Sequence, residues 1–337
     1  MEVKKMSYQD VWTIAEQNKG KIKEVSYEIL TRGRKLADKL GVGLALILLG
    51  YNIGDDKLNE LIHRGADKVY VVDDSVLENF IVENYSNVLV DLVRKYKPNI
   101  IVAGATTSGR TLMPHVAVRV NARLTADCTG LDIEKGTNNL LQTRPAIGGN
   151  ILATIKTPNN RPQMATVRVK STKPAPINKN RTGKIIKIEL KTELIDGKVE
   201  RIGFRKTEEE ATSIQDADII VSGGRGLRKK ENFALIRQLA KNLGGVVGAS
   251  RDAVDRGWIS YPHQVGLSGK TVSPKLYIAI GISGSIQHLA GIKTSDIIIA
   301  INNDPDAQIF KISDFGIVGD LFEVVPLLNE RLAKGVK

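Results

Sequence analysis

In the first third of the chain, apolar runs alternate with segments whose hydrophobic positions recur at a helical period. The run VGLALILLG, residues 42–50, is hydrophobic on both faces. Continuous apolar strands, each followed by a helix, predict a parallel sheet covered by helices on both sides. The predicted strands are 11–17, 42–50, 68–74 and 99–105, and the predicted helices are 22–41, 58–65 and 77–96.

After residues 109–121 the pattern changes to short β-like pieces separated by Gly, Asn and Pro. We expect these pieces to be strands added to the same sheet. A further strand is predicted at 184–193 and a linker near 190–208. The added pieces are 124–134, 140–148, 151–157 and 163–170.

Beyond the linker, the alternation of strand and helix restarts. The sequence therefore predicts an α/β protein with two domains, and 337 residues is too long for one ordinary core. Residues 1–200 are expected to form an N-terminal parallel-sheet domain with added strands, and residues 201–337 a C-terminal doubly wound α/β domain. The predicted elements are strands at 216–224, 245–251, 275–283 and 296–304, and helices at 230–244 and from about 317 to 334.

Composition excludes several classes of protein. No apolar run approaches the roughly 18–20 residues of a membrane span, and the first twenty residues lack an apolar signal-peptide core. We therefore expect a cytoplasmic protein without membrane insertion. The single cysteine, Cys128, excludes an internal disulfide, and the four histidines have no metal-ligand spacing, so no metal is expected.

The net charge of +12 is concentrated in one stretch, residues 161–206, which holds 13 Lys and Arg against 4 Asp and Glu. A basic surface attracts phosphate backbones, so nucleic acid is one interpretation. The stretch has no aromatic residue before Phe204, however, and thus offers no platform for stacking bases. We favour a solvated strand edge or linker, or a contact with an acidic protein, and expect no nucleic-acid partner.

Four glycine-rich corners follow or join the predicted strands of the second domain. In an open parallel sheet such turns emerge at the carboxyl edge, where ligands bind. Glycine lets the backbone approach a phosphate, and helix N-termini attract negative charge. One such turn would mean little, but four together favour a nucleotide or dinucleotide ligand. The corners are IIVSGGRGL (219–227), VVGASRDAV (246–254), QVGLSGKTV (264–272) and IAIGISGSIQHLAG (278–291).

The last corner predicts a short helix that begins near Gly284. Ile286, Leu289 and Ala290 recur at i, i+3 and i+4, so we expect them to face the sheet and Gly291 to end the helix. Gln287 and His288 then point away from the buried face. His288 is either an ordinary surface residue or a donor to an electron-rich ring, held protonated by nearby negative charge.

No pattern for covalent or acid–base catalysis emerges. There is no GxSxG elbow, and GLSGKT lacks the spacing of a Walker A loop. No catalytic residue is therefore assigned. A bound redox cofactor would account for this, because the cofactor then performs the chemistry while the protein binds it.

The stretch LYIAIGISGSIQHLAGIKTSDIIIAINNDPDAQIF, residues 276–310, resembles the α subunit of electron transfer flavoprotein. The resemblance continues through GGRGL, VGASR, QVGLSGK, DFGIVGDLFEVVPLLNE and QTRPAIGGNILATI, and so covers essentially the whole chain. It implies an α/β heterodimer whose α subunit binds FAD in its C-terminal domain. It also implies an electron carrier between a dehydrogenase or NADH and an acceptor such as an acyl-CoA dehydrogenase or quinone oxidoreductase.

The resemblance also implies which residues contact FAD. Arg251 would adjoin the isoalloxazine and raise its reduction potential, Ser268 would reach N5, and His288 would meet the pyrimidine oxygen. Leu267 departs from the pattern, since many members have Gln there. Asn302 and Asp320 would serve the adenosine end. The implied contacts are Arg225, Ser250, Arg251, Gln264, Val265, Gly266, Leu267, Ser268, Ser283, Gly284, Ser285, Ile286, Gln287, His288, Asn302, Asp320 and Leu321.

For the N-terminal domain, the resemblance implies a scaffold that contacts the β subunit. LTADCTGLDI and LLQTRPAIGGNILATI resemble the anaerobic branch of the family, some members of which bifurcate electrons from NADH with a second FAD in the β subunit. The turn GATTSGRTLMP, residues 104–114, either caps a helix and packs against the other subunit or contacts a nucleotide. A non-redox module that binds an adenine nucleotide remains the alternative function.

Overall fold

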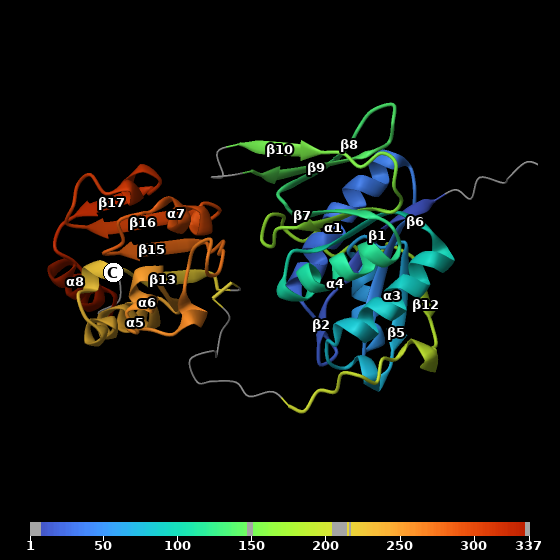
Figure 1. Ribbon diagram of the computed structural model, residues 1–337, viewed down its shortest axis with the longest axis horizontal. Coiled ribbons are helices and arrows are strands. Elements are labelled where there is room, and N and C mark those ends of the chain that lie inside the picture. Colours follow the sequence, from blue (N-terminus) through green and yellow to red (C-terminus); the bar gives the residue numbers. More distant parts are fainter. Residues whose placement is uncertain (1–7, 147–150, 204–213, 216, 334–337) are drawn as a thin grey trace, which may run out of the picture. The chain divides into compact units, whose positions relative to one another are not determined.

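The computed structural model describes residues 8–146, 151–203, 214–215 and 217–333. It divides into two compact units, Met1–Ile202 and Gly203–Lys337 (Figure 1). Part of the predicted linker, residues 204–208, and the end of the piece at 140–148 lie outside the described residues. Within the described residues, no helix has both the length and the apolar character needed to cross a membrane.

The N-terminal unit is built on a seven-stranded sheet in which every neighbouring pair is parallel, in the order β12-β5-β4-β1-β6-β11-β7. This confirms the parallel sheet that the apolar runs predict. The strands are β1 (Gln9–Ala15), β4 (Leu44–Gly50), β5 (Lys68–Asp73), β6 (Pro98–Gly104), β7 (Arg123–Cys128), β11 (Gln163–Val167) and β12 (Lys184–Lys187).

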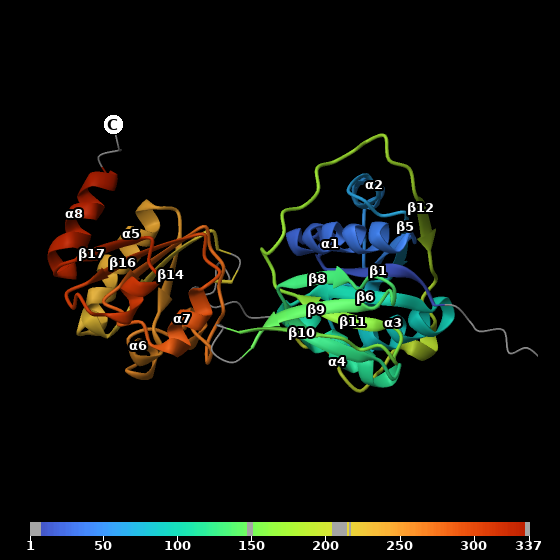
Figure 2. The same cartoon turned by 90° about the horizontal axis from the view of Figure 1, so that it is seen from above.

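Helices cover both faces of this sheet (Figure 2). Along β4, Leu44, Leu46 and Leu48 join the core beneath α1 and α2, while Ala45 and Ile47 join the core beneath α3 and α4. A strand between two apolar layers has no polar face, which explains the unbroken hydrophobic run. The helices are α1 (Glu24–Leu40), α2 (Asp55–His63), α3 (Val82–Tyr96) and α4 (Thr107–Arg119).

The prediction that all the short pieces join the main sheet is wrong in part. β7 and β11 do join it, but β8 (Gly130–Ile133), β9 (Leu140–Pro145) and β10 (Leu152–Ile155) form a separate antiparallel sheet. The side chains of β10 alternate between exposed and half-buried. Such strands have only one face to bury, so they pair with one another instead of entering a two-sided core. A second small antiparallel pair is β2 (Gln17–Asn18) with β3 (Lys21–Ile22).

The C-terminal unit is a doubly wound α/β domain. Its five strands are all parallel, in the order β14-β13-β15-β16-β17, and one core lies on each face of the sheet. The elements are β13 (Ile219–Gly223), α5 (Phe233–Asn242), β14 (Val246–Ala249), α6 (Arg251–Asp255), β15 (Leu276–Ile280), α7 (Ile286–Ile292), β16 (Ile297–Asn302), β17 (Phe315–Val318) and α8 (Leu321–Ala333).

One predicted boundary in this unit is wrong. The closing helix begins at Leu321, and the residues just before it form the edge strand β17. Phe315 and Val318 on β17 are 63% and 58% exposed. An edge strand that buries so little has no clear apolar period, so the pattern of the following helix extends over it.

The strand order places a switch point at β13. The chain leaves β13 to form β14 on one side, and it returns to form β15 on the other. Crossovers that run in opposite directions leave a crevice at the carboxyl ends of the two central strands. The crevice of this unit is therefore expected after Gly223 and Ile280.

Candidate functional site

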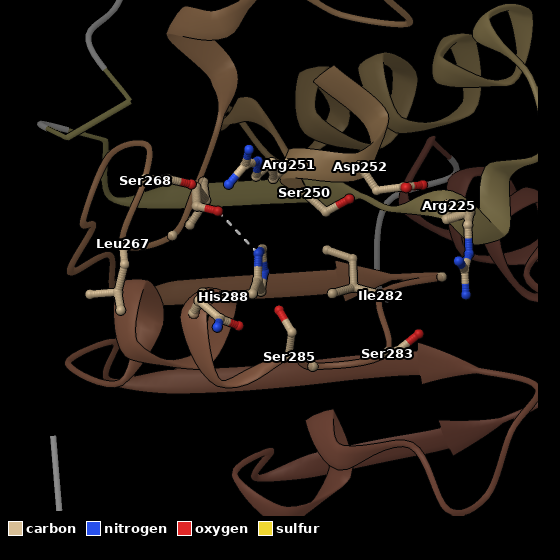
Figure 3. A pocket seen from close by; sticks show the side chains of 15 residues that line it. Arg225, Ser250, Arg251, Asp252, Leu267, Ser268, Ile282, Ser283, Ser285 and His288 are labelled. Carbon is tan, nitrogen blue, oxygen red and sulfur yellow. Dashed lines mark hydrogen bonds between the residues drawn. The ribbon is translucent and has the colours of Figure 1, made fainter. Parts of the chain in front are cut away.

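A cavity of about 470 Å³ lies at this switch point (Figure 3). Ser250, Arg251 and Asp252 enter it from one side, and Ser283 and Ser285 enter it from the other. Twelve of the residues proposed as cofactor contacts line it, which brings together segments far apart in the chain. They are Arg225, Ser250, Arg251, Val265, Gly266, Leu267, Ser268, Ser283, Gly284, Ser285, Gln287 and His288.

A second cavity, of about 300 Å³, adjoins the first. The two share Arg225, Gly281 and Ser283 in their walls. Three more of the expected contacts, Asn302, Asp320 and Leu321, line the second cavity. The pair of cavities suits an elongated ligand with two parts. Gln264 and Ile286 line neither cavity.

Sequence reasoning missed several lining residues. Gly281 follows β15 directly and adopts a φ of +61°, and Ile282 comes next. Asp252 lines the larger cavity, while Gly226 and Arg228 line the smaller one. The glycine-rich corners contain four of these five residues, and Arg228 directly follows the corner that ends at Leu227. Reading each corner as a whole loop would have found those four.

The Ser250 hydroxyl lacks a partner. Ser250 occupies the N-cap position of α6, yet its side chain accepts no hydrogen bond from the helix. Its Oγ is buried and has no hydrogen-bond partner. A buried polar atom without a partner costs about 1–3 kcal/mol, so this hydroxyl is suited to a ligand in the cavity.

Arg251 brings positive charge to the larger cavity. Its Nε lies 3.2 Å from Oδ2 of Asp255, and the two side chains are 68% and 61% exposed. An exposed ion pair of this kind is worth little, so the guanidinium can exchange Asp255 for another anionic or electron-rich group. Asp252 is paired in the same way with Arg256, at 2.9 Å.

Two family models match the chain. One, described as the electron transfer flavoprotein domain, matches residues 11–193, and the other, the electron transfer flavoprotein FAD-binding domain, matches residues 213–293. The chain belongs to the electron transfer flavoprotein α-subunit family. This confirms the resemblance seen in the sequence, and it confirms FAD as the cofactor.

Curated relatives agree with this family. An electron transfer flavoprotein α subunit from Thermoanaerobacterium thermosaccharolyticum is 51% identical over 97% of this chain and 98% of its own. One from Megasphaera elsdenii is 47% identical over 97% of both chains. Subunit LctC of a lactate dehydrogenase (NAD+, ferredoxin) from Acetobacterium woodii is 40% identical, over 97% of this chain and 77% of its own.

The cavity walls fit the FAD that this family binds. The walls carry the unpartnered Ser250 hydroxyl and the cations Arg225 and Arg251. They also contain glycines, at which two backbone segments approach each other closely. A Cβ on Gly284, where φ is +86°, would lie 2.4 Å from the backbone nitrogen of Ile309. Because these glycines have no side chain, the loops pack closely against each other and the cavity stays open for a flat or extended cofactor.

Gln264 supports the electron transfer flavoprotein site from behind the cavity wall. It is 3% exposed, and its Nε2 donates to Oγ of Ser268 at 3.0 Å. Because Ser268 accepts this hydrogen bond, its own O–H remains available as a donor. Gln264 thus orients the hydroxyl and does not itself line the cavity.

His288 corrects one expectation, since it does not point away from the buried face of α7. It is 5% exposed, and burial lowers its pKa to about 4. The predicted helix face is rotated, because α7 buries His288, Gly291 and Ile292, while Ile286 is 68% exposed. α7 also continues past Gly291 to Ile292.

The rotation of α7 has a physical cause in the neighbouring loop. Gly291 packs so closely on Gly266 that a Cβ added to Gly291 would lie 2.5 Å from the Cα of Gly266. Gly266 also adopts a φ of +138°. The pairing of two glycines turns the His288 face inward, toward the loop at 264–267. His288 still lines the cavity, but as a neutral and buried ring.

The contacts at the smaller cavity are partly structural. Asn302 donates from Nδ2 to the carbonyl oxygen of Ile282 at 3.0 Å, and its Oδ1 accepts from the Asp304 amide at 3.0 Å. Asp320 accepts from the Phe322 amide at the start of α8, at 2.8 Å. These side chains hold the loops that form the cavity.

The turn at 104–114 caps a helix. Thr106 precedes α4, and its Oγ1 accepts from the Gly109 amide at 3.0 Å. The carboxylate of Glu16 also accepts from the Thr106 hydroxyl. The predicted helix cap is therefore present, while subunit packing and a nucleotide contact at this turn stay predictions.

The basic stretch at 161–206 is tied to carboxylates of the N-terminal unit. Its ion pairs include Arg168–Asp127, Arg181–Asp67, Lys187–Asp55 and Lys191–Asp91. These pairs favour a structural edge over a free basic surface. Its last residues, 204–206, lie outside the described residues.

Proposed function

We propose that the chain is the α subunit of a heterodimeric electron transfer flavoprotein and that its partner is an electron transfer flavoprotein β subunit. Residues 1–200 are assigned as the scaffold that contacts the β subunit, and residues 201–337 as the FAD-binding domain. The family-model match at 213–293 supports the second assignment. The chain is then an electron carrier and not an enzyme with a substrate of its own.

One observation carries this proposal: two adjoining cavities at the switch point of the C-terminal sheet share Arg225, Gly281 and Ser283. FAD has a flat ring system at one end, an adenosine at the other and a pyrophosphate between them. We assign the larger cavity to the ring and the smaller one to the adenosine. The pyrophosphate then lies beside Arg225, since arginine pairs well with phosphate oxygens.

The residues of the larger cavity have distinct roles in this assignment. Bound FAD supplies the electron-carrying chemistry. Arg251 places positive charge beside the ring, which favours the added negative charge of reduction and raises the reduction potential. Ser268 donates its hydroxyl hydrogen to the ring edge, and Ser250 gains the hydrogen-bond partner that it lacks in the protein.

We further propose that the complex takes electrons from a dehydrogenase or NADH and passes them to an acyl-CoA dehydrogenase or a quinone oxidoreductase. The name of the 40% identical Acetobacterium relative pairs NAD+ with ferredoxin. That name supports a version of the proposal in which the complex bifurcates electrons with a second FAD held by the β subunit.

The proposal is tested by purifying the full chain together with an electron transfer flavoprotein β subunit from the same organism. The bound nucleotides are released by denaturation, identified by chromatography and counted per heterodimer. One FAD with one AMP supports a simple carrier, and two FAD support bifurcation. Adenine nucleotide alone, with no FAD retained or taken up on reconstitution, would overturn the proposal in favour of a non-redox nucleotide module.

A further inference from the structure

We propose that Tyr277 is a positioning residue that fixes the tautomer of His288 and keeps this histidine neutral in the wall of the flavin cavity. The inference rests on the proposed function only in taking the ligand of the cavity to be a flavin. The hydrogen-bond chain that carries it belongs to the protein alone.

The chain of hydrogen bonds links three segments of the C-terminal unit. Tyr277 lies on β15 and is fully buried, and its hydroxyl oxygen is 3.0 Å from Nε2 of His288 on α7. The other ring nitrogen, Nδ1, is 3.1 Å from the carbonyl oxygen of Val265. Both nitrogens of the imidazole are thus engaged by groups within the protein.

The two partners determine where the proton lies. A carbonyl oxygen can only accept a hydrogen bond, so Nδ1 of His288 must carry the hydrogen. A neutral imidazole has a single N–H, so Nε2 is bare and accepts from the Tyr277 hydroxyl. The geometry therefore selects the Nδ1–H tautomer, with the phenol as donor.

The surroundings favour the neutral form. Burial lowers the pKa of His288, and no carboxylate forms a hydrogen bond with its ring among the described residues. The charged residues that line the cavity with His288 are Arg225, Arg251 and Asp252. Arg251 is paired with Asp255 on α6, and Asp252 is paired with Arg256 just after it. Tyr277 is the titratable group in contact with His288, and burial raises its pKa far above the ordinary value.

The hydroxyl of Tyr277 explains why a tyrosine occupies this core position. A buried phenol is costly without a partner, and phenylalanine would fill the same space at no such cost. The neighbouring Ser222 is also fully buried and moderates the rise in the pKa of Tyr277, but its Oγ lies outside hydrogen-bond geometry and has no partner. His288 is therefore the partner that satisfies the phenol, and the phenol in turn holds the ring.

The consequence for a flavin is specific. While both bonds persist, His288 offers the cavity an uncharged ring with no free N–H. The flavin potential is then set by Arg251 and is independent of His288 near neutral pH. Without the phenol, Nε2 loses its donor, and the ring is free to change tautomer or to turn an N–H toward the cavity.

The test is ¹⁵N NMR of the histidine rings in the full chain complexed with its β subunit, followed with pH from about 5.5 to 8.5, which spans the ordinary histidine pKa. The expected result is a neutral Nδ1–H tautomer for His288 without titration. An Nε2–H tautomer or a titrating His288 would overturn the proposal, even if the Tyr277→Phe variant fails to fold. Loss of FAD with an intact Nδ1–H tautomer would count against the proposed function alone.

In Tyr277→Phe, the His288 resonances are expected to shift toward a mixture of tautomers, and the flavin potential is expected to acquire a new pH dependence. Tyr261→Phe is the matched control, because this exposed phenol donates to the backbone oxygen of Ser268 and does not contact His288. Unchanged His288 resonances and an unchanged pH profile in Tyr277→Phe would overturn the proposal.

Discussion

The backbones of Gly226 and Gly281 are in direct contact at the point where the two cavities meet. The Gly226 amide donates to the Gly281 carbonyl oxygen at 3.0 Å, and a Cβ on Gly226 would lie 2.7 Å from the Cα of Gly281. Gly281 itself has a φ of +61°. The loops after β13 and β15 can approach this closely only because neither residue has a side chain.

Gly281→Ala is therefore expected to damage both the fold and the cofactor site. The left-handed backbone and the clash with Gly226 together should lower the free energy of unfolding by about 2–4 kcal/mol. FAD content after purification should fall as well. Gly197→Ala is the control, because an added Cβ there meets nothing within 4 Å. Equal stability and FAD content for the two variants would contradict this account of the loop contact.

Ser250→Ala should separate stability from binding. The hydroxyl has no partner in the protein, so its removal is expected to leave the thermal stability of the flavin-free protein unchanged or slightly higher. FAD affinity should fall by about 10-fold or more, the value of one hydrogen bond to a polar ligand. Calorimetry of the flavin-free protein and FAD titration measure the two effects. A loss of stability with unchanged affinity would show that the hydroxyl serves the fold instead.

The Arg251–Asp255 pair is expected to tune the flavin potential in two directions. Arg251→Ala removes a positive charge near the ring and should lower the potential by tens of millivolts or more, an order of magnitude set by one charge at partly screened distance. Asp255→Asn removes the opposing charge and should raise it. A potentiometric titration of both variants gives the signs. The same potential in all three proteins would remove Arg251 from its proposed role.

Glu28 is expected to make stability depend on pH. It is 7% exposed on α1, accepts from the Lys170 amide at 2.7 Å, and has its pKa raised to about 7 by burial. The folded protein therefore holds this proton more tightly than the unfolded chain does. The stabilisation that Glu28 contributes is fully present below pH 4.5, the ordinary pKa of a glutamate. It is lost as the pH rises through 7, and the loss amounts to about 3 kcal/mol in the free energy of unfolding.

Glu28→Gln should flatten this fall, because a glutamine keeps the acceptor for the Lys170 amide but does not titrate. Urea unfolding at several pH values between 4.5 and 7 measures the slope. Glu189→Gln, at an exposed position that does not contribute to the raised pKa of Glu28, is the control. The lowered pKa values of Asp67 and Asp127 act below this window, where stability falls as pH falls. A slope that survives in Glu28→Gln would assign the effect to another group.

The sequence correctly predicts the elements whose own pattern of apolar side chains shows which of their faces are buried. β4 is apolar on both faces because it lies in the middle of a two-sided sheet, so its run of leucines was sufficient. β17 was missed because Phe315 and Val318 are exposed at the sheet edge. Local pattern carries no signal for a strand defined mainly by its hydrogen bonds to β16.

The candidate site likewise has features that local sequence predicts and features that depend on contacts between distant segments. The glycine-rich corners could be recognised because their composition follows from the close approach of backbones. The rotation of α7 could not, because it depends on Gly291 meeting Gly266, a contact between two segments. The burial of His288 likewise depends on Tyr277 from the neighbouring strand, and periodicity within α7 does not report that partner.

A crystal structure of the full chain with its β subunit and FAD tests the central claim most directly. The account predicts the isoalloxazine in the larger cavity, within hydrogen-bond distance of the Ser268 and Ser250 hydroxyls and beside Arg251. It also predicts the adenosine in the smaller cavity, next to Asp320. Flavin density outside these cavities, or an adenine nucleotide without flavin within them, would contradict it.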